Sequence, residues 1–104
     1  MRKILLVCNA GISTSILVSK MKRAAMDEGI DVSIEVKSMV GAKAVIQEAD
    51  IVLLAPQIGY EQKNLQAISG GVPVEKINVT DFGLKNGEKV LKEAMKILEN
   101  KAES

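Results

Sequence analysis

Short aliphatic runs alternate with stretches of helical periodicity along the whole chain, and this alternation constrains the fold more than any other feature. Four segments rich in aliphatic residues are predicted to be strands, at 4–7, 31–36, 51–55 and 74–79. Four segments with helical apolar spacing or composition are predicted to be helices, at 15–28, 40–49, 61–68 and 87–100. Regular alternation of strand and helix with short connections indicates a parallel sheet that helices cover on both faces.

The distribution of apolar residues among these segments predicts the order of the strands. The runs at 4–7 and 51–55 are continuously aliphatic, which is typical of strands buried on both faces in the middle of a sheet. The segment 31–36 alternates apolar and polar residues and is therefore predicted to lie at an edge. With right-handed crossovers, the four-stranded parallel sheet takes the order 2-1-3-4, in an α/β fold of the flavodoxin-like or low-molecular-weight-phosphatase-like kind. We expect residues 1–104 to form a single domain, with a loop at 80–87.

Composition excludes several classes of function. The chain has 104 residues, with 14 basic and 13 acidic side chains, one cysteine and no histidine. Balanced charge and a near absence of aromatic residues give no case for a nucleic-acid partner. The apolar runs are too short to cross a membrane, and a single cysteine fits a reducing compartment, so we expect a cytoplasmic protein without membrane insertion. One cysteine without histidine cannot supply the usual zinc ligands, and no nucleotide-binding glycine motif is present, so neither a metal nor a cofactor is expected.

The only cysteine, Cys8, directly follows the first predicted strand. The segment CNAGISTS, residues 8–15, follows that strand, and PQIGY, residues 56–60, follows the third. In the order 2-1-3-4 the strand order reverses between these two strands, and open parallel sheets bind ligands beyond the carboxyl ends of their strands at such a point. The topology therefore predicts a site at Cys8, with the two segments side by side.

The residues after Cys8 favour an anion. Gly11 allows backbone amides to turn inward, the predicted helix begins near residues 13–15, and Ser13, Thr14 and Ser15 add hydroxyl groups. The same environment favours the thiolate, so Cys8 is expected to be more nucleophilic than a free cysteine. A lone cysteine is more often a small buried apolar residue, and a hydroxyl residue can simply cap a helix. Capping accounts for one of the three hydroxyl residues, and the location of the loop favours phosphate chemistry on sulfur.

Two other functions remain open at this point. A cysteine phosphatase of the low-molecular-weight kind has cysteine, five residues and then arginine in this loop, with a general acid in a later one. Here Thr14 stands at the arginine position, which removes the bidentate phosphate clamp, although Asp81 lies where the general acid could be kept. A non-catalytic anion-binding or regulatory module would use the same loop, and would bind phosphate equally well after Cys8→Ser.

Two segments resemble one bacterial family closely. LLVCNAGISTSILVSKM, residues 5–21, and IVLLAPQIGY, residues 51–60, resemble the IIB proteins of the phosphoenolpyruvate:sugar phosphotransferase system, in the lactose, cellobiose and diacetylchitobiose class. The loop of that class typically runs Cys-Ser-Ala-Gly-Met-Ser-Thr-Ser. This chain departs from it at Asn9 and Ile12, and the resemblance covers essentially all of its length.

The resemblance implies a phosphocysteine carrier and phosphotransferase. Cys8 would accept a phosphoryl group from a phosphohistidine of a IIA protein and pass it to a sugar held by the membrane IIC protein, during sugar uptake. The sugar would be a β-disaccharide such as cellobiose, chitobiose or lactose, and the carrier is expected to be a monomer. The residues implied to bind phosphate are Asn9, Ala10, Gly11, Ile12, Ser13, Thr14 and Ser15. Gln57 and Tyr60 either border the site or are ordinary turn residues.

Overall fold

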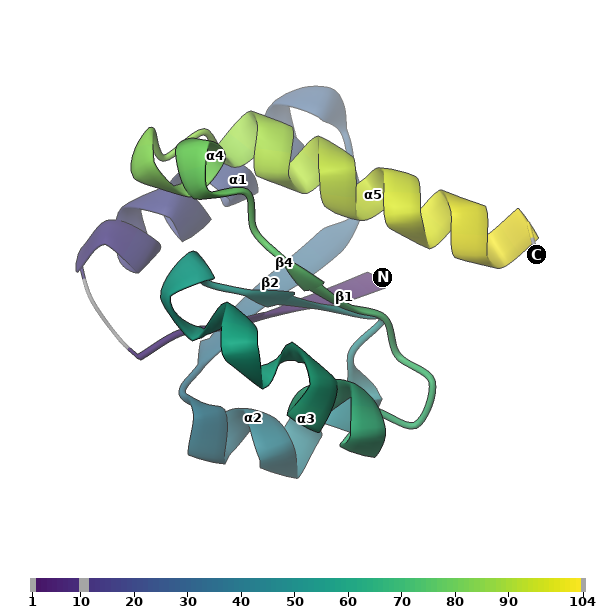
Figure 1. Ribbon diagram of the computed structural model, residues 1–104. Coiled ribbons are helices and arrows are strands. Elements are labelled where there is room, and N and C mark those ends of the chain that lie inside the picture. The colour runs from purple at the N-terminus through teal and green to yellow at the C-terminus, as the bar shows by residue number, and fades with distance from the viewer. Residues whose placement is uncertain (1, 10–11, 104) are drawn as a thin grey trace.

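The computed structural model describes residues 2–9 and 12–103, in which a parallel sheet lies between two layers of helices (Figure 1). The strands are β1 (Arg2–Val7), β2 (Val32–Lys37), β3 (Ile51–Leu54) and β4 (Val74–Lys76). The α-helices are α1 (Ile12–Glu28), α2 (Met39–Val45), α3 (Gln62–Ile68), α4 (Val79–Gly83) and α5 (Gly87–Glu103). Two short 3₁₀ helices are η1 (Ile46–Glu48) and η2 (Pro56–Glu61).

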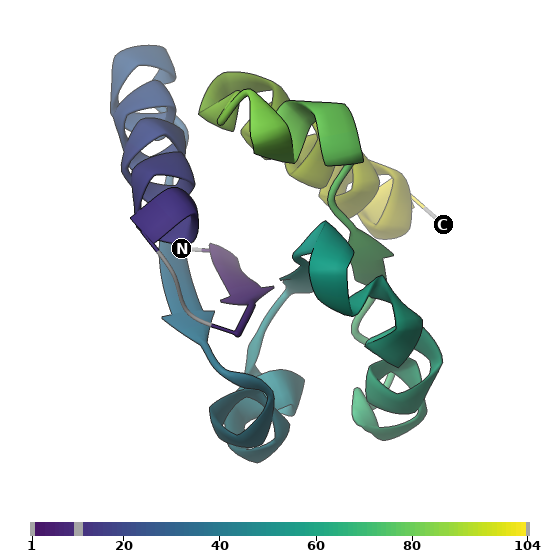
Figure 2. The same ribbon diagram turned by 60° about the vertical axis from the view of Figure 1, so that its left-hand side comes forward.

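The sheet has the order β2-β1-β3-β4 and all of its neighbouring strands are parallel, which confirms the predicted topology. Helices α1, α4 and α5 cover one face, while α2 and α3 cover the other (Figure 2). The residues 4–7 of β1 and 51–54 of β3 are at most 4% exposed, as expected for the two central strands. The core therefore lies on both sides of β1 and β3, and the carboxyl ends of the strands gather at one edge.

Helix α5 packs along α1, and a glycine sets how closely they approach. The apolar face predicted for α5 is buried, with Leu91 and Ala94 fully inaccessible. At Gly87, the first residue of α5, a Cβ atom would lie 2.6 Å from the backbone nitrogen of Met21 in α1. Because real Cβ atoms do not come that close to backbone, only glycine fits at this contact.

The β4–α5 region differs from its prediction. The fourth strand ends at Lys76 rather than at residue 79, and the first half of the predicted loop 80–87 is helix α4. The cause is Asn78, whose side chain accepts hydrogen bonds from the backbone N–H groups of Thr80 at 2.8 Å and Asp81 at 3.1 Å. This N-cap satisfies two of the amides that a helix start leaves free, and so it begins a new helix directly after the strand.

Smaller differences lie elsewhere in the chain. The predicted helix at 40–49 is α2 followed by the 3₁₀ turn η1, and the PQIGY segment forms η2 rather than an irregular turn. The first helix begins at Ile12, slightly before the predicted 13–15. In the described residues, no helix is both long enough and apolar enough to span a bilayer.

Two glutamine side chains from α3 cover the open edge of β4. The Gln66 side-chain oxygen accepts a hydrogen bond from the Val74 N–H at 3.0 Å, and its nitrogen donates to the Val72 carbonyl at 2.9 Å. The Gln62 side-chain nitrogen donates to the Val74 carbonyl at 2.8 Å. These bonds occupy backbone groups that an edge strand otherwise offers to another chain.

Candidate functional site

Cys8 lies between the connections that follow the two neighbouring strands. Its backbone N–H donates to the Lys37 carbonyl at the end of β2, at 3.1 Å. On the other side, the Ala55 N–H donates to the Val7 carbonyl at 3.0 Å, and Ala55 is followed directly by η2. The structure therefore brings Cys8 beside the start of the PQIGY segment, at the point where the strand order reverses.

The Cys8 side chain is 3% exposed and belongs to the hydrophobic core at this edge. Helix α1 begins only four residues later, so its amino-terminal end faces the same edge of the sheet. Its first turn contains no acidic residue. A helix start carries partial positive charge and unpaired N–H groups, and it thus offers an anion a favourable position beside the thiol.

The predicted phosphate-binding residues divide into three groups. Ala10 and Gly11 lie outside the described residues, and for Ile12 and Ser13 only the backbone, in the first turn of α1, is described. Thr14 is buried, at 5% exposure, whereas Asn9 and Ser15 face solvent. The three hydroxyl residues therefore do not share one direction: Thr14 turns inward and Ser15 outward.

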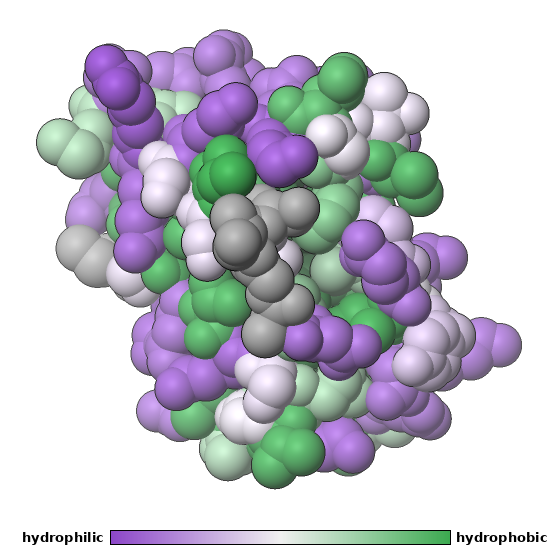
Figure 3. Space-filling view, turned by 90° about the vertical axis from the view of Figure 1, so that its left-hand side faces the viewer, coloured by the Kyte–Doolittle hydropathy of each residue, from purple (hydrophilic) through white to green (hydrophobic). Residues whose placement is uncertain are grey.

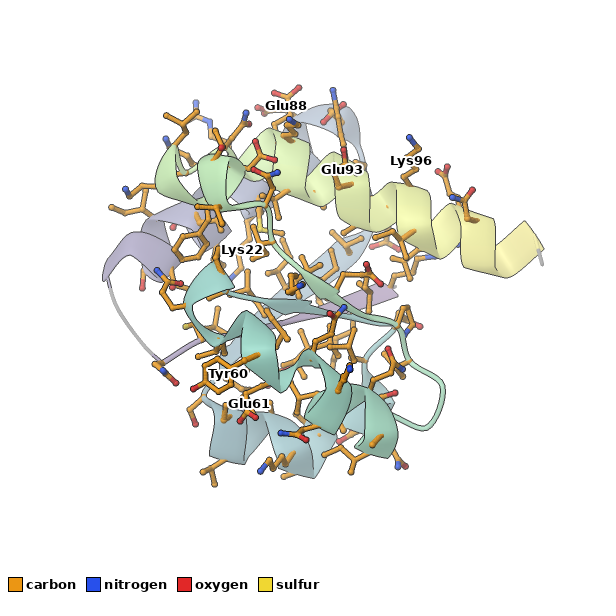
Figure 4. All side chains as sticks on the ribbon, viewed as in Figure 1. Lys22, Tyr60, Glu61, Glu88, Glu93 and Lys96 are labelled. Carbon is orange, nitrogen blue, oxygen red and sulfur yellow. The ribbon has the colours of Figure 1, made fainter. Side chains whose placement is uncertain are left out.

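Gln57 and Tyr60 lie on η2, in the connection after β3. Both side chains are exposed, Tyr60 by 78%, while Ile58 between them is buried and anchors the segment. Figure 4 shows Tyr60 at the end of the molecule where the connections following the strands gather. Both side chains therefore face solvent on the connection that follows β3.

The carboxylate of Asp81 is occupied by an ion pair. Asp81 lies in the first turn of α4 and is 5% exposed, and one of its oxygens is 3.5 Å from the Lys89 ammonium on α5. An acid that protonates a leaving group must reach the substrate. The burial of Asp81 and its pairing with Lys89 indicate that it joins α4 to α5, and they argue against the phosphatase interpretation.

A hollow of about 500 Å³ lies between η2 and the connection from β4 to α4. It is lined by Pro56, Gly59, Tyr60, Lys76, Ile77, Asn78 and Val79. Lys76 is its only charged residue, and the Lys76 side chain runs directly over Gly59. Sequence reasoning missed this hollow, since Lys76 and Gly59 are 17 positions apart and only the pairing of β3 with β4 brings them together.

Exposed apolar side chains surround the site. Four of the large apolar side chains that solvent reaches lie in the helical segments that follow the strands: Ile16, Val40, Tyr60 and Val79. Val36 lies near the end of β2, and Met26, Ile68 and Leu84 are exposed elsewhere. Figure 3 views this end of the molecule and shows apolar patches on several sides of it. An apolar rim around a reactive position is typical of a surface that contacts another protein. Within 2–9 and 12–103, no three His, Cys, Asp or Glu side chains are grouped to hold a metal ion.

Comparison with known proteins gives consistent matches. The family model described as "PTS system, Lactose/Cellobiose specific IIB subunit" matches residues 3–93. The oligo-beta-mannoside-specific EIIB component of Bacillus subtilis (strain 168) is 36% identical over 102 residues, which are 96% of this chain and 99% of that protein. The cellobiose-specific EIIB component of Lactococcus lactis subsp. lactis (strain IL1403) is 37% identical over 102 residues, 91% of this chain and 94% of that protein.

Two solved structures resemble the fold. The solution structure of the cellobiose-specific phosphotransferase IIB component from Borrelia burgdorferi has a TM-score of 0.80 and 42% identity, covering 95% of this chain and 93% of that one. The lactose-specific IIB component domain from Streptococcus pneumoniae has a TM-score of 0.81 at 15% identity, covering 91% of this chain and 95% of that one. The second match supports the fold alone.

Proposed function

Because the chain belongs to the lactose/cellobiose-specific IIB family of the phosphotransferase system, a family of sugar phosphotransferase components, we propose that Cys8 is its phosphoryl carrier. In this proposal the Cys8 thiolate attacks the phosphorus of a phosphohistidine on a IIA protein. The S–P bond forms as the P–N bond breaks, and the histidine leaves as a neutral imidazole after taking a proton. A sugar hydroxyl held by the membrane IIC protein then attacks the same phosphorus, loses its proton, and releases the Cys8 thiolate.

The observation that carries this proposal is the position of Cys8 directly ahead of the amino-terminal end of α1. The first turn of this 17-residue helix has no acidic residue, so its N–H groups and dipole are available to a phosphoryl dianion on sulfur. We assign the phosphate-binding role to residues 9–15, mainly through their backbone amides, since the side chain of Ser15 faces solvent. Gln57 and Tyr60 border the site and contact a docked partner.

Thr14 in place of arginine fits a carrier better than a hydrolase. A carrier must hold the phosphoryl group without passing it to water, and a guanidinium aimed at the equatorial oxygens would also stabilise the transition state for hydrolysis. The Thr14 side chain is buried and uncharged, and therefore adds no such charge. The position of Asp81, paired with Lys89, further disfavours hydrolysis.

The apolar rim supports docking of protein partners over Cys8. Both the IIA protein and the IIC protein must reach the same sulfur, so their docking surfaces overlap and they bind in sequence. We propose a cytoplasmic monomer that acts as a single IIB domain over residues 1–104. Two relatives are named for oligo-beta-mannoside and cellobiose, which supports a β-linked disaccharide such as cellobiose, chitobiose or lactose as the final acceptor, while a third is named for the monosaccharide galactose.

Intact-mass spectrometry tests the carrier role directly. The wild-type chain and Cys8→Ser are incubated with phosphoenolpyruvate, the upstream phosphotransfer proteins and IIA proteins of the lactose/cellobiose class. The expected result is a gain of one phosphoryl mass in the wild-type chain and none in Cys8→Ser. No gain in an assay where the IIA proteins themselves become phosphorylated would refute the proposal.

A further inference from the structure

Asn86 connects two helices, since it ends α4 and begins α5. Its backbone N–H donates to the Asp81 carbonyl in α4 at 2.9 Å. Its side-chain oxygen accepts a hydrogen bond from the Lys89 N–H at 3.2 Å, and its carbonyl accepts one from the Val90 N–H at 3.1 Å, both in α5. Asn86 is therefore the N-cap of α5, and this one residue fixes how α5 follows α4.

The residue after Asn86 must be glycine. A Cβ atom at Gly87 would lie 2.6 Å from the Met21 nitrogen in α1. An N-cap and a close helix contact thus place asparagine directly before glycine, and this pair occurs once in the chain. Asparagine followed by glycine is chemically labile, because glycine has no side chain to keep its amide nitrogen away from the side-chain carbon of the asparagine.

Water reaches this pair of residues. The Asn86 side chain is exposed, and it lines a hollow of about 400 Å³ together with Lys20 and Arg23 of α1. Figure 2 shows the connection from α4 to α5 at the outer surface, beside α1. The side-chain amide of Asn86 is therefore open to attack and to hydrolysis wherever the connection loosens.

We propose that Asn86 is a deamidation site, and that opening of the α4–α5 connection sets the rate of the reaction. The Gly87 nitrogen loses its proton to hydroxide and attacks the side-chain carbonyl carbon of Asn86. A C–N bond to Gly87 forms, the bond to the side-chain nitrogen breaks, and ammonia leaves with a proton from water. Water then hydrolyses the resulting succinimide at either carbonyl, which gives aspartate or isoaspartate. The reaction does not involve Cys8 and is independent of the proposed carrier role.

Both reacting groups are engaged while the connection is closed. The Gly87 N–H donates to the Lys85 carbonyl at 3.0 Å, and the Asn86 side-chain oxygen is held by the Lys89 N–H. These bonds must break before the nitrogen can attack, which is a local opening of the fold. Lys85 has a φ of 55°, a left-handed conformation that a side chain disfavours, and this strain weakens the closed form.

The two products differ in their effect on α5. Aspartate at position 86 keeps a capping oxygen and adds a negative charge at the helix start, so α5 stays capped. Isoaspartate carries the main chain through its former side chain, which inserts one methylene group between residues 86 and 87. The contact of Gly87 with Met21 leaves no room for this shift, so isoaspartate destabilises the packing of α5 against α1.

Peptide mapping by mass spectrometry, after incubation at mildly alkaline pH, tests the site. The wild-type chain is incubated folded and, in parallel, unfolded in concentrated urea. We expect conversion at Asn86 in both samples, ahead of the other four asparagines. The reaction should be roughly 5- to 30-fold slower in the folded chain, the factor that corresponds to the loss of a helix cap. Asn86→Ser keeps a capping hydroxyl without an amide and should show no conversion at position 86.

Lys85→Gly tests whether opening of the connection sets the rate. Glycine adopts the left-handed conformation without strain, so it should slow conversion in the folded chain about 2- to 5-fold and leave the rate in urea unchanged. Lys85→Gln is the matched control, since it removes the charge, keeps the strain and should convert at the wild-type rate.

Two results would overturn the proposal. Equal rates in the folded and unfolded wild-type chain, or in folded wild type and Lys85→Gly, would show that the connection does not control the reaction. An absence of conversion at Asn86 in the folded chain, over a time that allows for slowing by a factor of about 30, would remove the site itself. Neither result bears on phosphorylation of Cys8, which intact-mass spectrometry measures separately.

Discussion

The contact between α1 and α5 makes Gly87→Ala the most informative test of the fold. The added Cβ atom would lie 2.6 Å from both the Met21 nitrogen and the Lys20 Cβ, and 2.7 Å from the Lys20 carbonyl carbon. Two of these three atoms belong to the α1 backbone, so the clash cannot be relieved by rotating a side chain. Helix α5 must instead move away from α1, and α1 is the helix whose amino-terminal end faces Cys8.

The size of the effect follows from two opposing contributions. Overpacking in a well-packed region costs about 1–3 kcal/mol. Alanine in place of glycine recovers up to about 1 kcal/mol of helix propensity, and less than that at the first residue of a helix. We therefore expect Gly87→Ala to lower the free energy of unfolding by about 1–2 kcal/mol, which corresponds to a fall in Tm of roughly 4–8 °C per kcal/mol.

Urea denaturation followed by circular dichroism measures this change, and Gly83→Ala provides the control. Gly83 lies in α4, and a Cβ atom there would meet no other atom within 4 Å. Gly83→Ala should therefore leave stability unchanged or raise it by up to about 1 kcal/mol. If Gly87→Ala proved as stable as wild type, the close approach of α5 to α1 would be wrong.

Three further changes test the site, the sheet edge and the surface charges. Thr14→Arg places a guanidinium beside the sulfur and is expected to speed hydrolysis of the phosphocysteine. The loss of phosphoryl mass over time measures this rate, in a variant first shown to be folded. An unchanged lifetime of the phosphocysteine would count against the role given to the missing arginine. Gln66→Leu leaves the Val74 N–H without its acceptor, so we expect the free energy of unfolding to fall by about 1–3 kcal/mol. We also expect the variant to self-associate through β4 in sedimentation experiments. An unchanged monomer would show that the edge of β4 needs no cover. The hydrogen bond from Lys92 to Glu88, with the charges of the neighbouring carboxylates, raises the pKa of Lys92 above its usual 10.5. The stabilising effect of the charged Lys92 side chain is therefore complete below pH 10.5 and is lost as pH rises through the raised pKa. Side-chain NMR titration should show the Lys92 pKa fall in Glu88→Gln, and no change would exclude that hydrogen bond as its main cause.

The alternation of segments predicted the sheet because the two central strands carry enough aliphatic residues to specify their own burial. The continuous runs of β1 and β3 could fit only the middle of the sheet, and the structure places them there. Helix α4 could not be found in this way, since five residues are too few to show helical periodicity. Its one signal was Asn78, a strong N-cap residue that lies inside the predicted strand 74–79.

The candidate site was predictable where it depends on chain order and unpredictable where it depends on register. The position of Cys8 follows from topology alone, because the reversal of strand order fixes one edge of the sheet. The opposite directions of Thr14 and Ser15 depend on the residue at which α1 begins, and a shift of one or two positions changes which hydroxyl turns inward. The contact of Lys76 with Gly59 requires the β3–β4 register, which no short-range pattern encodes.

The position of the exposed apolar side chains around Cys8 predicts that docking and chemistry are independent. If partners bind through the rim, Cys8→Ser should still bind the phosphorylated IIA protein although its hydroxyl is a much weaker nucleophile than a thiolate. Added to the wild-type reaction, Cys8→Ser should then inhibit phosphoryl transfer competitively with respect to wild-type chain. Its inhibition constant should be close to the dissociation constant of the wild-type complex.

Competitive inhibition by Cys8→Ser shows that the rim recognises the donor without help from the sulfur. Its absence would mean that donor binding requires the thiolate itself, and that the rim and the reacting centre form a single recognition surface.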